Sequence, residues 1–261
     1  MLLDGLLLAL FAILGLAMGS FLNVCIDRLP GRRSIISPPS ACDACNHKLG
    51  VRDMVPLFSY LWLRGRCRYC RAPIPRRLPA VELAMGVVFS LLYWYYGLSL
   101  MLGFSLIYAL LLTLIFVIDI ERQLILDTVV YPGMGLALAF SLFYPGFSPF
   151  DPLEGVKQAA LGGAIGLVLM LIAFLISRGG MGFGDVKMAA LVGLIVGFPR
   201  VFIALFLSVI AGGLVAGVLL AARLKTRRQP IPFGPFLAGG AMLVVVWGTQ
   251  IQLWYQQLFS R

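Results

Sequence analysis

The chain has 261 residues, of which 61% are hydrophobic and only 12% are charged, and its mean hydropathy is +0.96. Soluble domains carry about twice that share of charge, so the composition excludes an ordinary soluble protein and favours an integral membrane protein. The formal net charge of +10 could suit a nucleic-acid ligand. However, no phosphate-cradling loop or aromatic-basic platform accompanies the charge, and we expect no nucleic-acid partner.

Apolar runs along the chain predict an all-α polytopic membrane protein with about eight transmembrane helices, because about 20 apolar residues cross the bilayer core as a helix. The first run covers residues 5–25, and Asp4 stands where a signal peptide would be basic, so we expect a retained span. The remaining spans are predicted over residues 80–97, 100–118, 126–145, 158–177, 186–198, 201–221 and 235–251.

Three parts follow from this reading: a first transmembrane helix over residues 1–26, a polar segment over 27–79, and a membrane-embedded domain of about seven helices over 80–261. The polar segment has many prolines and no helical period, which is typical of a small loop-rich module. Such a module buries too small a hydrophobic core to be stable alone and needs a cross-link such as disulfides or a bound metal. We call residues 27–79 the four-cysteine module.

Two Cys-x-x-Cys pairs can supply that cross-link. Cys42 and Cys45 form the first pair, Cys67 and Cys70 form the second, and 21 residues separate them. This spacing is close to that of four-cysteine zinc sites, in which four thiolates close a tetrahedron. Two disulfides or a redox dithiol are the alternatives, but a reducing compartment disfavours disulfides. We therefore predict a closed, structural zinc site.

The basic residues predict the orientation of the chain. Eleven of the 21 lie between Arg28 and Arg77, and the positive-inside rule places that loop in the cytoplasm. Alternation of the spans then leaves only Lys157, Arg200 and Arg261 outside, with both termini on the external, periplasmic side. The lipid bilayer is thus an expected partner, since its anionic headgroups attract the basic loops.

Two aspartates beside predicted spans are candidates for catalysis, because acidic groups are costly near the bilayer core. Asp119 ends one apolar run and Asp185 begins a run that returns, so we expect both at the cytoplasmic border. Two adjacent carboxyls can share one proton, one acting as a base toward water while the other donates to a carbonyl. Four glycines within residues 179–184 would let an extended peptide approach Asp185.

Spacing alone leaves alternatives to this pair open. Asp127 and Glu121 compete with Asp119 for the partner role. The glycine segment could also be an interhelical turn in which Asp185 caps the next helix. A transporter would use the same aspartates differently, to carry protons or cations across the bilayer.

Two other charged residues are expected to be structural. Glu82 opens the second span, and we expect it to pair with Arg76 or Arg77. Lys187 lies two positions beyond Asp185 and is expected to extend toward the lipid headgroups.

Seven motifs follow one another in an order that resembles the bacterial type IV prepilin peptidases over nearly the whole chain. They are Gly19-Ser20-Phe21-Leu22-Asn23-Val24, Arg28-Leu29-Pro30, the paired Cys-x-x-Cys, Pro79-Ala80-Val81-Glu82-Leu83, Ile118-Asp119 with Asp127 after it, Gly180-Met181-Gly182-Phe183-Gly184-Asp185-Val186-Lys187, and Ile231-Pro232-Phe233-Gly234-Pro235-Phe236-Leu237.

The resemblance implies a membrane aspartic endopeptidase of the bacterial inner membrane. Such an enzyme removes the short basic leader, after a glycine, from prepilins and type II secretion pseudopilins. It also implies N-methylation of the new N-terminal residue with S-adenosylmethionine as methyl donor, although no residue indicates where the donor binds. The catalytic pair would be Asp119 and Asp185, and zinc would bind Cys42, Cys45 and the second cysteine pair. The oligomeric state is left open.

Overall fold

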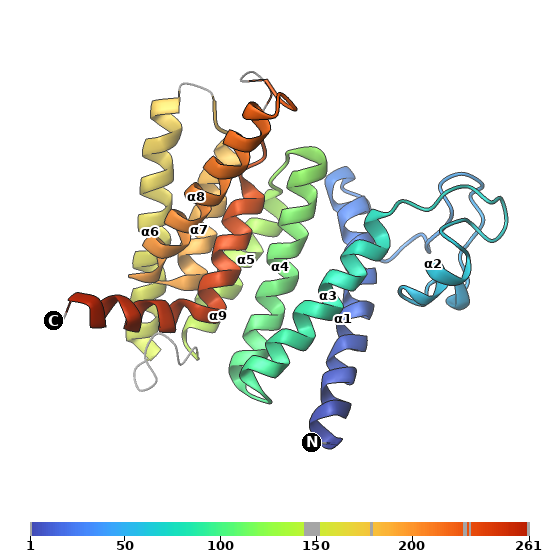
Figure 1. Cartoon of the computed structure of the whole chain (residues 1–261), viewed down its shortest axis with the longest axis horizontal. Helices are drawn as coiled ribbons and strands as arrows, with labels where there is room; N and C mark the ends of the chain where they lie inside the picture. The colour runs from blue at the N-terminus through green and yellow to red at the C-terminus, as the bar shows by residue number, and fades with distance from the viewer. Residues whose placement is uncertain (1, 144–151, 178–179, 227–228, 230, 260–261) are drawn as a thin grey trace. The chain divides into compact units, whose positions relative to one another are not determined.

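The computed structural model describes residues 2–143, 152–177, 180–226, 229 and 231–259, and these residues form helices and loops without strands (Figure 1). The helices are α1 (Leu2–Arg28), α2 (Phe58–Trp62), α3 (Arg77–Tyr96), α4 (Leu100–Arg122), α5 (Asp127–Ser141), α6 (Pro152–Ser177), α7 (Phe183–Val196), α8 (Arg200–Ala221) and α9 (Gly234–Phe259), with short 3-10 helices over Leu29–Gly31 and Val51–Asp53. The basic residues Arg178, Arg227, Arg228 and Arg261, and Gly179 of the glycine segment, lie outside the described residues.

Helices occupy all eight predicted span ranges, so the all-helical, multi-pass membrane fold is confirmed. Six of them are long and apolar enough to cross a membrane, namely α1, α3, α4, α6, α8 and α9. The other two, α5 and α7, have 15 and 14 residues. Both are shorter than the roughly 20 residues that a perpendicular crossing takes, so the count of eight spans remains a prediction.

The chain divides into two compact units, residues 1–106 and 107–261. In the first unit α1 packs along α3 (Figure 1). The close approach depends on Gly19, where an added Cβ would lie 2.7 Å from the Cα of Glu82. Ile26 of α1 and Met85 of α3 are fully buried, so apolar packing holds the pair together.

Polar contacts also join α1 to α3 and attach the loop of the four-cysteine module to α3. Arg77 Nη2 donates to both carboxylate oxygens of Asp27, each at 2.8 Å. The carboxylate of Glu82 instead accepts a hydrogen bond from the backbone N–H of Leu57, at 2.9 Å. This contact joins Glu82 to the loop before α2, and the expected pairing of Glu82 with Arg76 or Arg77 stays a prediction. Asn23 is buried and donates to the Leu78 carbonyl at 3.0 Å.

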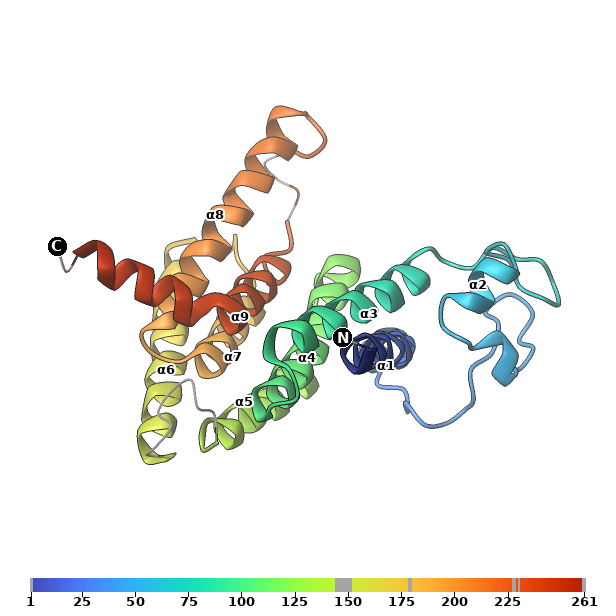
Figure 2. The ribbon, with the colours of Figure 1, turned by 60° about the horizontal axis from the view of Figure 1, so that its bottom comes forward.

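In the second unit, α7 lies at the centre and packs against α5, α6, α8 and α9 (Figure 2). Its sequence is apolar all round, and every residue from 188 to 197 is buried. A helix of that kind belongs inside a bundle rather than at a lipid-facing surface. The backbone of α6 approaches it through small residues, since a Cβ on Gly163 would lie 2.7 Å from Leu194 Cγ.

Candidate active site and metal site

Asp119 lies in the last turns of α4 and is only 4% exposed. Its Oδ2 accepts a hydrogen bond of 3.0 Å from the backbone N–H of Gly234, the first residue of α9. The N–H groups that open a helix have no intrahelical acceptor and carry the positive end of the helix dipole. The start of α9 therefore offers a donor and a favourable field to an ionised Asp119.

The site leaves no room for a side chain at residue 234. A Cβ built on Gly234 would lie 2.6 Å from Asp119 Oδ2, well inside van der Waals contact. The glycine of the Pro232-Phe233-Gly234-Pro235 segment thus lets the backbone reach the carboxylate. The sequence reading used this segment only for family resemblance, and no local pattern links it to an aspartate 115 positions away.

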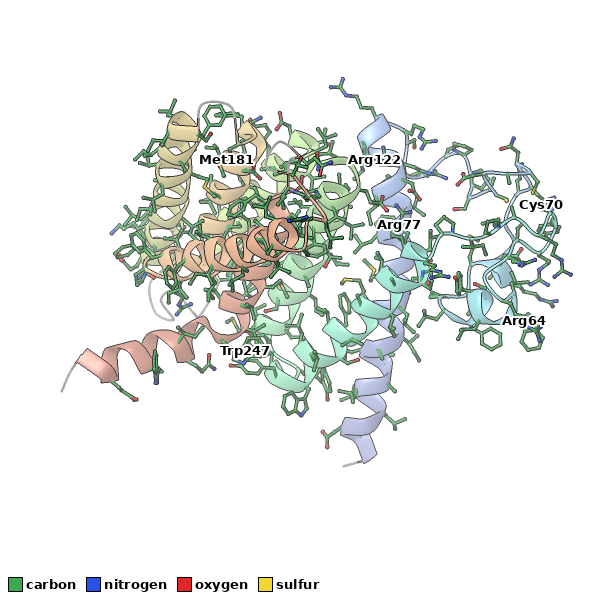
Figure 3. All side chains as sticks on the ribbon, turned by 45° about the horizontal axis from the view of Figure 1, so that its top comes forward. Arg64, Cys70, Arg77, Arg122, Met181 and Trp247 are labelled. Atoms are coloured by element: carbon green, nitrogen blue, oxygen red, sulfur yellow. The ribbon has the colours of Figure 1, made fainter. Side chains whose placement is uncertain are left out.

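Asp185 lies in the first turn of α7, whose N-cap is Gly182. Its N–H donates to the Gly182 carbonyl at 3.2 Å. A Cβ on Gly184 would lie 2.9 Å from Ile125 Cβ, so this glycine lets α7 begin close against the turn between α4 and α5. The ends of these helices are marked in Figure 3 by Arg122 and Met181, which lie at the same end of the unit.

The structure brings Asp119 and Asp185 together, close enough for the two charges to repel one another. One is buried on α4 and the other is half-buried at the start of α7. Adjacent carboxyls in such a place hold one proton between them more readily than two negative charges. The pair can therefore present one carboxylate and one carboxylic acid to a bound molecule.

Asp127 and Lys187 form a separate ion pair beside these aspartates. Lys187 Nζ lies 2.7 Å from Asp127 Oδ1, and 5.4 Å from the ring centroids of both Tyr131 and Phe183. A carboxylate and two aromatic rings thus surround the Lys187 ammonium, and its extension toward the headgroups stays a prediction. Asp127 faces a cation rather than another acid, and Glu121 is exposed. Neither arrangement resembles the charge repulsion between Asp119 and Asp185.

The four cysteines of the module come together as the spacing predicts. All their Sγ atoms lie within 4.8 Å of one another, and Cys42 Sγ lies 3.8 Å from Cys70 Sγ. A tetrahedral zinc with Zn–S bonds of about 2.3 Å places its sulfurs about 3.8 Å apart. The donor set and its spacing fit such an ion, so the four cysteines could bind a metal.

Both cysteine pairs have the same backbone geometry. The N–H of the first cysteine, Cys42 or Cys67, donates to the carbonyl five residues on, at 3.0 and 2.8 Å. The residue after each pair, Asn46 or Arg71, has a positive φ of 54° or 62°. The backbone N–H groups of Cys70 and of the residue before it lower the pKa of Cys67 to about 7, which favours a thiolate.

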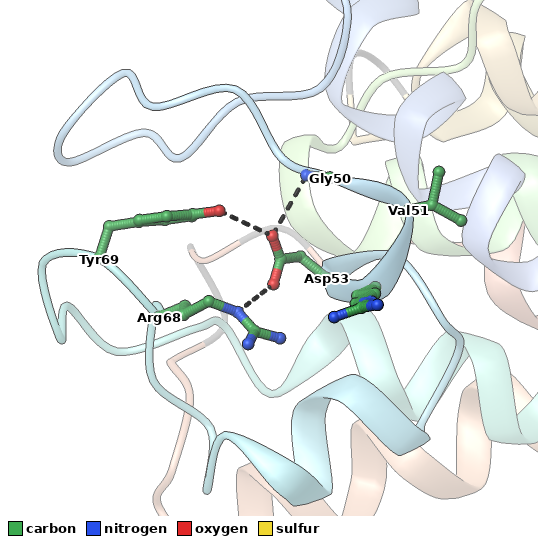
Figure 4. Close-up of a pocket in the computed structure, with 6 residues that line it drawn as sticks. Gly50, Val51, Asp53, Arg68 and Tyr69 are labelled. Carbon is green, nitrogen blue, oxygen red and sulfur yellow. Dashed lines mark hydrogen bonds and ion pairs between the residues drawn. The ribbon is translucent and has the colours of Figure 1, made fainter.

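Asp53 joins the two halves of the module (Figure 4). Its carboxylate accepts hydrogen bonds from Arg68 Nε at 2.6 Å, the Gly50 N–H at 3.2 Å and the Tyr69 hydroxyl at 3.4 Å. Desolvation alone would raise the pKa of Asp53, but the Arg68 and Gly50 hydrogen bonds more than offset it and lower the pKa. Tyr69 also packs against His47, with ring centroids 3.6 Å apart. Sequence reasoning missed this network because its members are far apart along the module.

Fold and site together define a multi-pass helical membrane protein that carries a pair of adjacent aspartates in one unit and a four-cysteine cluster in the other. Comparison with known proteins gives the family. Residues 13–96 match the bacterial peptidase A24 N-terminal domain, and residues 106–217 match the type IV leader peptidase family.

The relatives extend this match over nearly the whole chain. Proteins named prepilin leader peptidase/N-methyltransferase from Stutzerimonas stutzeri and Bacillus subtilis are 33% and 32% identical to it. The alignments cover 95% of this chain in both cases, and 93% and 98% of the two relatives. A third relative of that name, from Pseudomonas aeruginosa, is 32% identical over 94% of this chain and 92% of its own length. No solved structure matches significantly. The chain belongs to the type IV leader peptidase family, which confirms the resemblance drawn from the motifs.

Proposed function

We propose that this protein is a prepilin peptidase that removes the basic leader from prepilins and type II secretion pseudopilins, and that it also N-methylates the new N-terminal residue. Family membership and the shared name of the relatives support both activities. The observation that carries the peptidase activity is that Asp119 and Asp185, two acids on different helices, lie within range of each other's charge. Nothing in the family match favours the transporter alternative.

Asp119 is the base of the proposed mechanism, because the Gly234 N–H and the start of α9 stabilise its ionised form. It removes a proton from water while the protonated Asp185 donates to the oxygen of the scissile carbonyl. The hydroxide adds to the carbonyl carbon and gives a gem-diol. Asp119 then passes its proton to the leaving nitrogen, the C–N bond breaks, and a gem-diol proton returns to Asp185.

The substrate would reach this pair as an extended backbone. Gly182 presents no side chain beside Asp185 at the start of α7, so a peptide can lie close to that carboxyl. We place this end of the bundle at the cytoplasmic face of the bacterial inner membrane, with both termini external, because the basic loops then face inward. The domain limits in this proposal are residues 1–26, 27–79 and 80–261.

The metal of the four-cysteine module is proposed to be zinc, held by Cys42, Cys45, Cys67 and Cys70. Four thiolates leave no open coordination position, so bound zinc would hold the two cysteine pairs together rather than activate water. Proteolysis therefore depends on the aspartates alone.

The methyl donor has no assigned residues. The module contains a cavity of about 450 Å³ lined by Arg52, Asp53, Arg68, Tyr69 and two neighbours. Its arginines do not fit a cationic sulfonium, and the Asp53 carboxylate is already paired with Arg68. Methylation is thus proposed from the relatives only, and no step of it is derived.

The test uses purified protein in detergent with a prepilin carrying its leader. Mass spectrometry of the product N-terminus reports the cleavage position and any added methyl group in one measurement. We expect cleavage after a glycine, and uncleaved substrate from a protein that is folded and metal-bound would refute the proposal. Asp119→Asn in the same assay separates enzymatic cleavage from a contaminating protease.

A further inference from the structure

Helix α2 presents an apolar face that the described part of the chain leaves exposed. Phe58, Leu61 and Trp62 are 61%, 71% and 71% exposed. Leu61 and Trp62 follow Phe58 by three and four residues, so both lie on the same side of the helix as Phe58. The rings of Phe58 and Trp62 stack with centroids 5.8 Å apart. A cluster of large, exposed apolar side chains is typical of a surface that binds a membrane or another protein.

The position of α2 along α3 indicates what covers it. Glu82, whose carboxylate accepts the Leu57 N–H at 2.9 Å, lies five residues beyond Arg77, where α3 begins. At a rise of about 1.5 Å per residue, this contact lies about 7.5 Å down a helix that is long and apolar enough to cross the membrane. The headgroup layer is roughly 5–7 Å thick on each side. The start of α2 therefore lies at the depth where headgroups meet acyl chains.

Figure 1 agrees with this depth, since α2 lies to the side of α1 rather than beyond its end. Because α2 lies beside the transmembrane helices at the depth of the headgroups, the molecules next to it are lipids. Trp and Tyr side chains favour this layer because an apolar ring and a polar N–H or O–H are both accommodated there.

The charge around α2 also suits a lipid surface. Arg52, Arg64 and Arg66 are exposed on either side of it in the sequence, and the module carries eleven basic residues against three acidic ones. Anionic headgroups attract such a surface. A basic peptide, such as the leader of the proposed substrate, would be repelled by it.

We propose that the four-cysteine module docks on the bilayer through α2. Phe58, Leu61 and Trp62 enter the boundary between headgroups and acyl chains, and the neighbouring arginines bind anionic headgroups. Interfacial helices of other proteins bind membranes in the same way, with an apolar face in the acyl boundary and basic residues at the anionic headgroups. The docking fixes the module beside the membrane independently of its metal and of either proposed activity.

The experiment places the full-length protein in nanodiscs of phosphatidylglycerol and phosphatidylcholine. The emission of Trp62 is isolated by subtracting the spectrum of Trp62→Phe, which keeps an aromatic ring at the position. We expect quenching by lipids brominated near the headgroup end of the chain, and protection from aqueous iodide. Quenching by iodide without quenching by brominated lipid would overturn the proposal. Protection from both quenchers would also overturn it, because protein, such as a second copy of the chain, would then cover α2.

Two matched variants test the face itself. Leu61→Glu places a carboxylate on it and should lower brominated-lipid quenching of Trp62 at least about twofold. Ile36→Glu makes the same kind of change at a residue that is 88% exposed in the module but not on α2, and should leave quenching unchanged. Equal effects of the two variants would overturn the assignment to α2. Resistance of the four thiols to alkylation reports, for each variant, that the module is still folded.

Discussion

Replacement of Gly234 by alanine isolates the contact that holds Asp119. The added Cβ would lie 2.6 Å from Asp119 Oδ2, whereas ordinary contact begins at 3.4 Å. The carboxylate must therefore retreat by the difference, about 0.8 Å, which stretches the present N–H···O distance of 3.0 Å beyond hydrogen-bonding range. The backbone N–H is still present in the variant, so the change removes the contact without removing the donor.

The expected effect is a loss of rate rather than of substrate binding. A hydrogen bond to a charged group contributes about 1.5–3 kcal/mol, which corresponds to about a 10- to 100-fold fall in rate if the contact acts on the transition state. We expect kcat for leader cleavage to fall by that factor with little change in KM. The acidic limb of the pH–rate profile should also move to higher pH, because the ionised carboxylate loses a donor.

The assay is leader cleavage of a purified prepilin, followed across pH by gel or mass spectrometry. Gly239→Ala is the matched control, since it makes the same substitution on the same helix at a place where a Cβ meets no atom within 4 Å. Wild-type rate and pH profile in Gly234→Ala would refute the assignment of Gly234 as a positioning residue. Equal losses in both variants would assign the effect to α9 as a whole.

The other predictions concern the pair, the metal and the orientation. Asp119→Asn and Asp185→Asn should each abolish cleavage in a folded protein, and the double variant should be no worse, because the two act as one unit. Asp127→Asn should cost less than about tenfold, since it breaks a partly exposed ion pair; a dead Asp127→Asn beside an active Asp119→Asn would reassign the pair. Elemental analysis should find one zinc per chain, and Cys42→Ser should lower that content; four alkylatable thiols without metal would contradict this. An impermeant thiol reagent should not label residues 27–79 in intact cells, and labelling there would reverse the proposed orientation.

Local patterns in the sequence predicted the parts of the molecule that depend on local physics. Apolar runs predicted the long helices, because hydrocarbon thickness sets their length. The spacing of the two Cys-x-x-Cys pairs predicted that the four thiols come together, since each short turn brings its two thiols onto one side. The alternation of spans placed Asp119 and Asp185 at the same end of the helical bundle, and the structure brings them near each other; their depth in the membrane and their role in catalysis remain predictions.

Features that depend on packing between distant segments could not be predicted. The carboxylate of Glu82 faces the Leu57 amide because the loop folds back along α3, and no charge pattern indicates this. The ion pair between Lys187 and Asp127 joins residues 60 positions apart. The central position of α7 in its bundle could not be predicted either, because an apolar helix has the same sequence pattern whether lipid or protein surrounds it.

The donor to Asp119 belongs to α9, which follows both aspartates along the chain and leaves the ribosome after them. Both aspartates are synthesised and can enter the membrane well before residue 234 exists. A nascent chain at that stage would hold its acids without the amide that keeps one of them ionised. Insertion of α9 would therefore be an assembly step of its own, and the proposed protease would gain full activity only after residue 234 had been synthesised and placed beside Asp119.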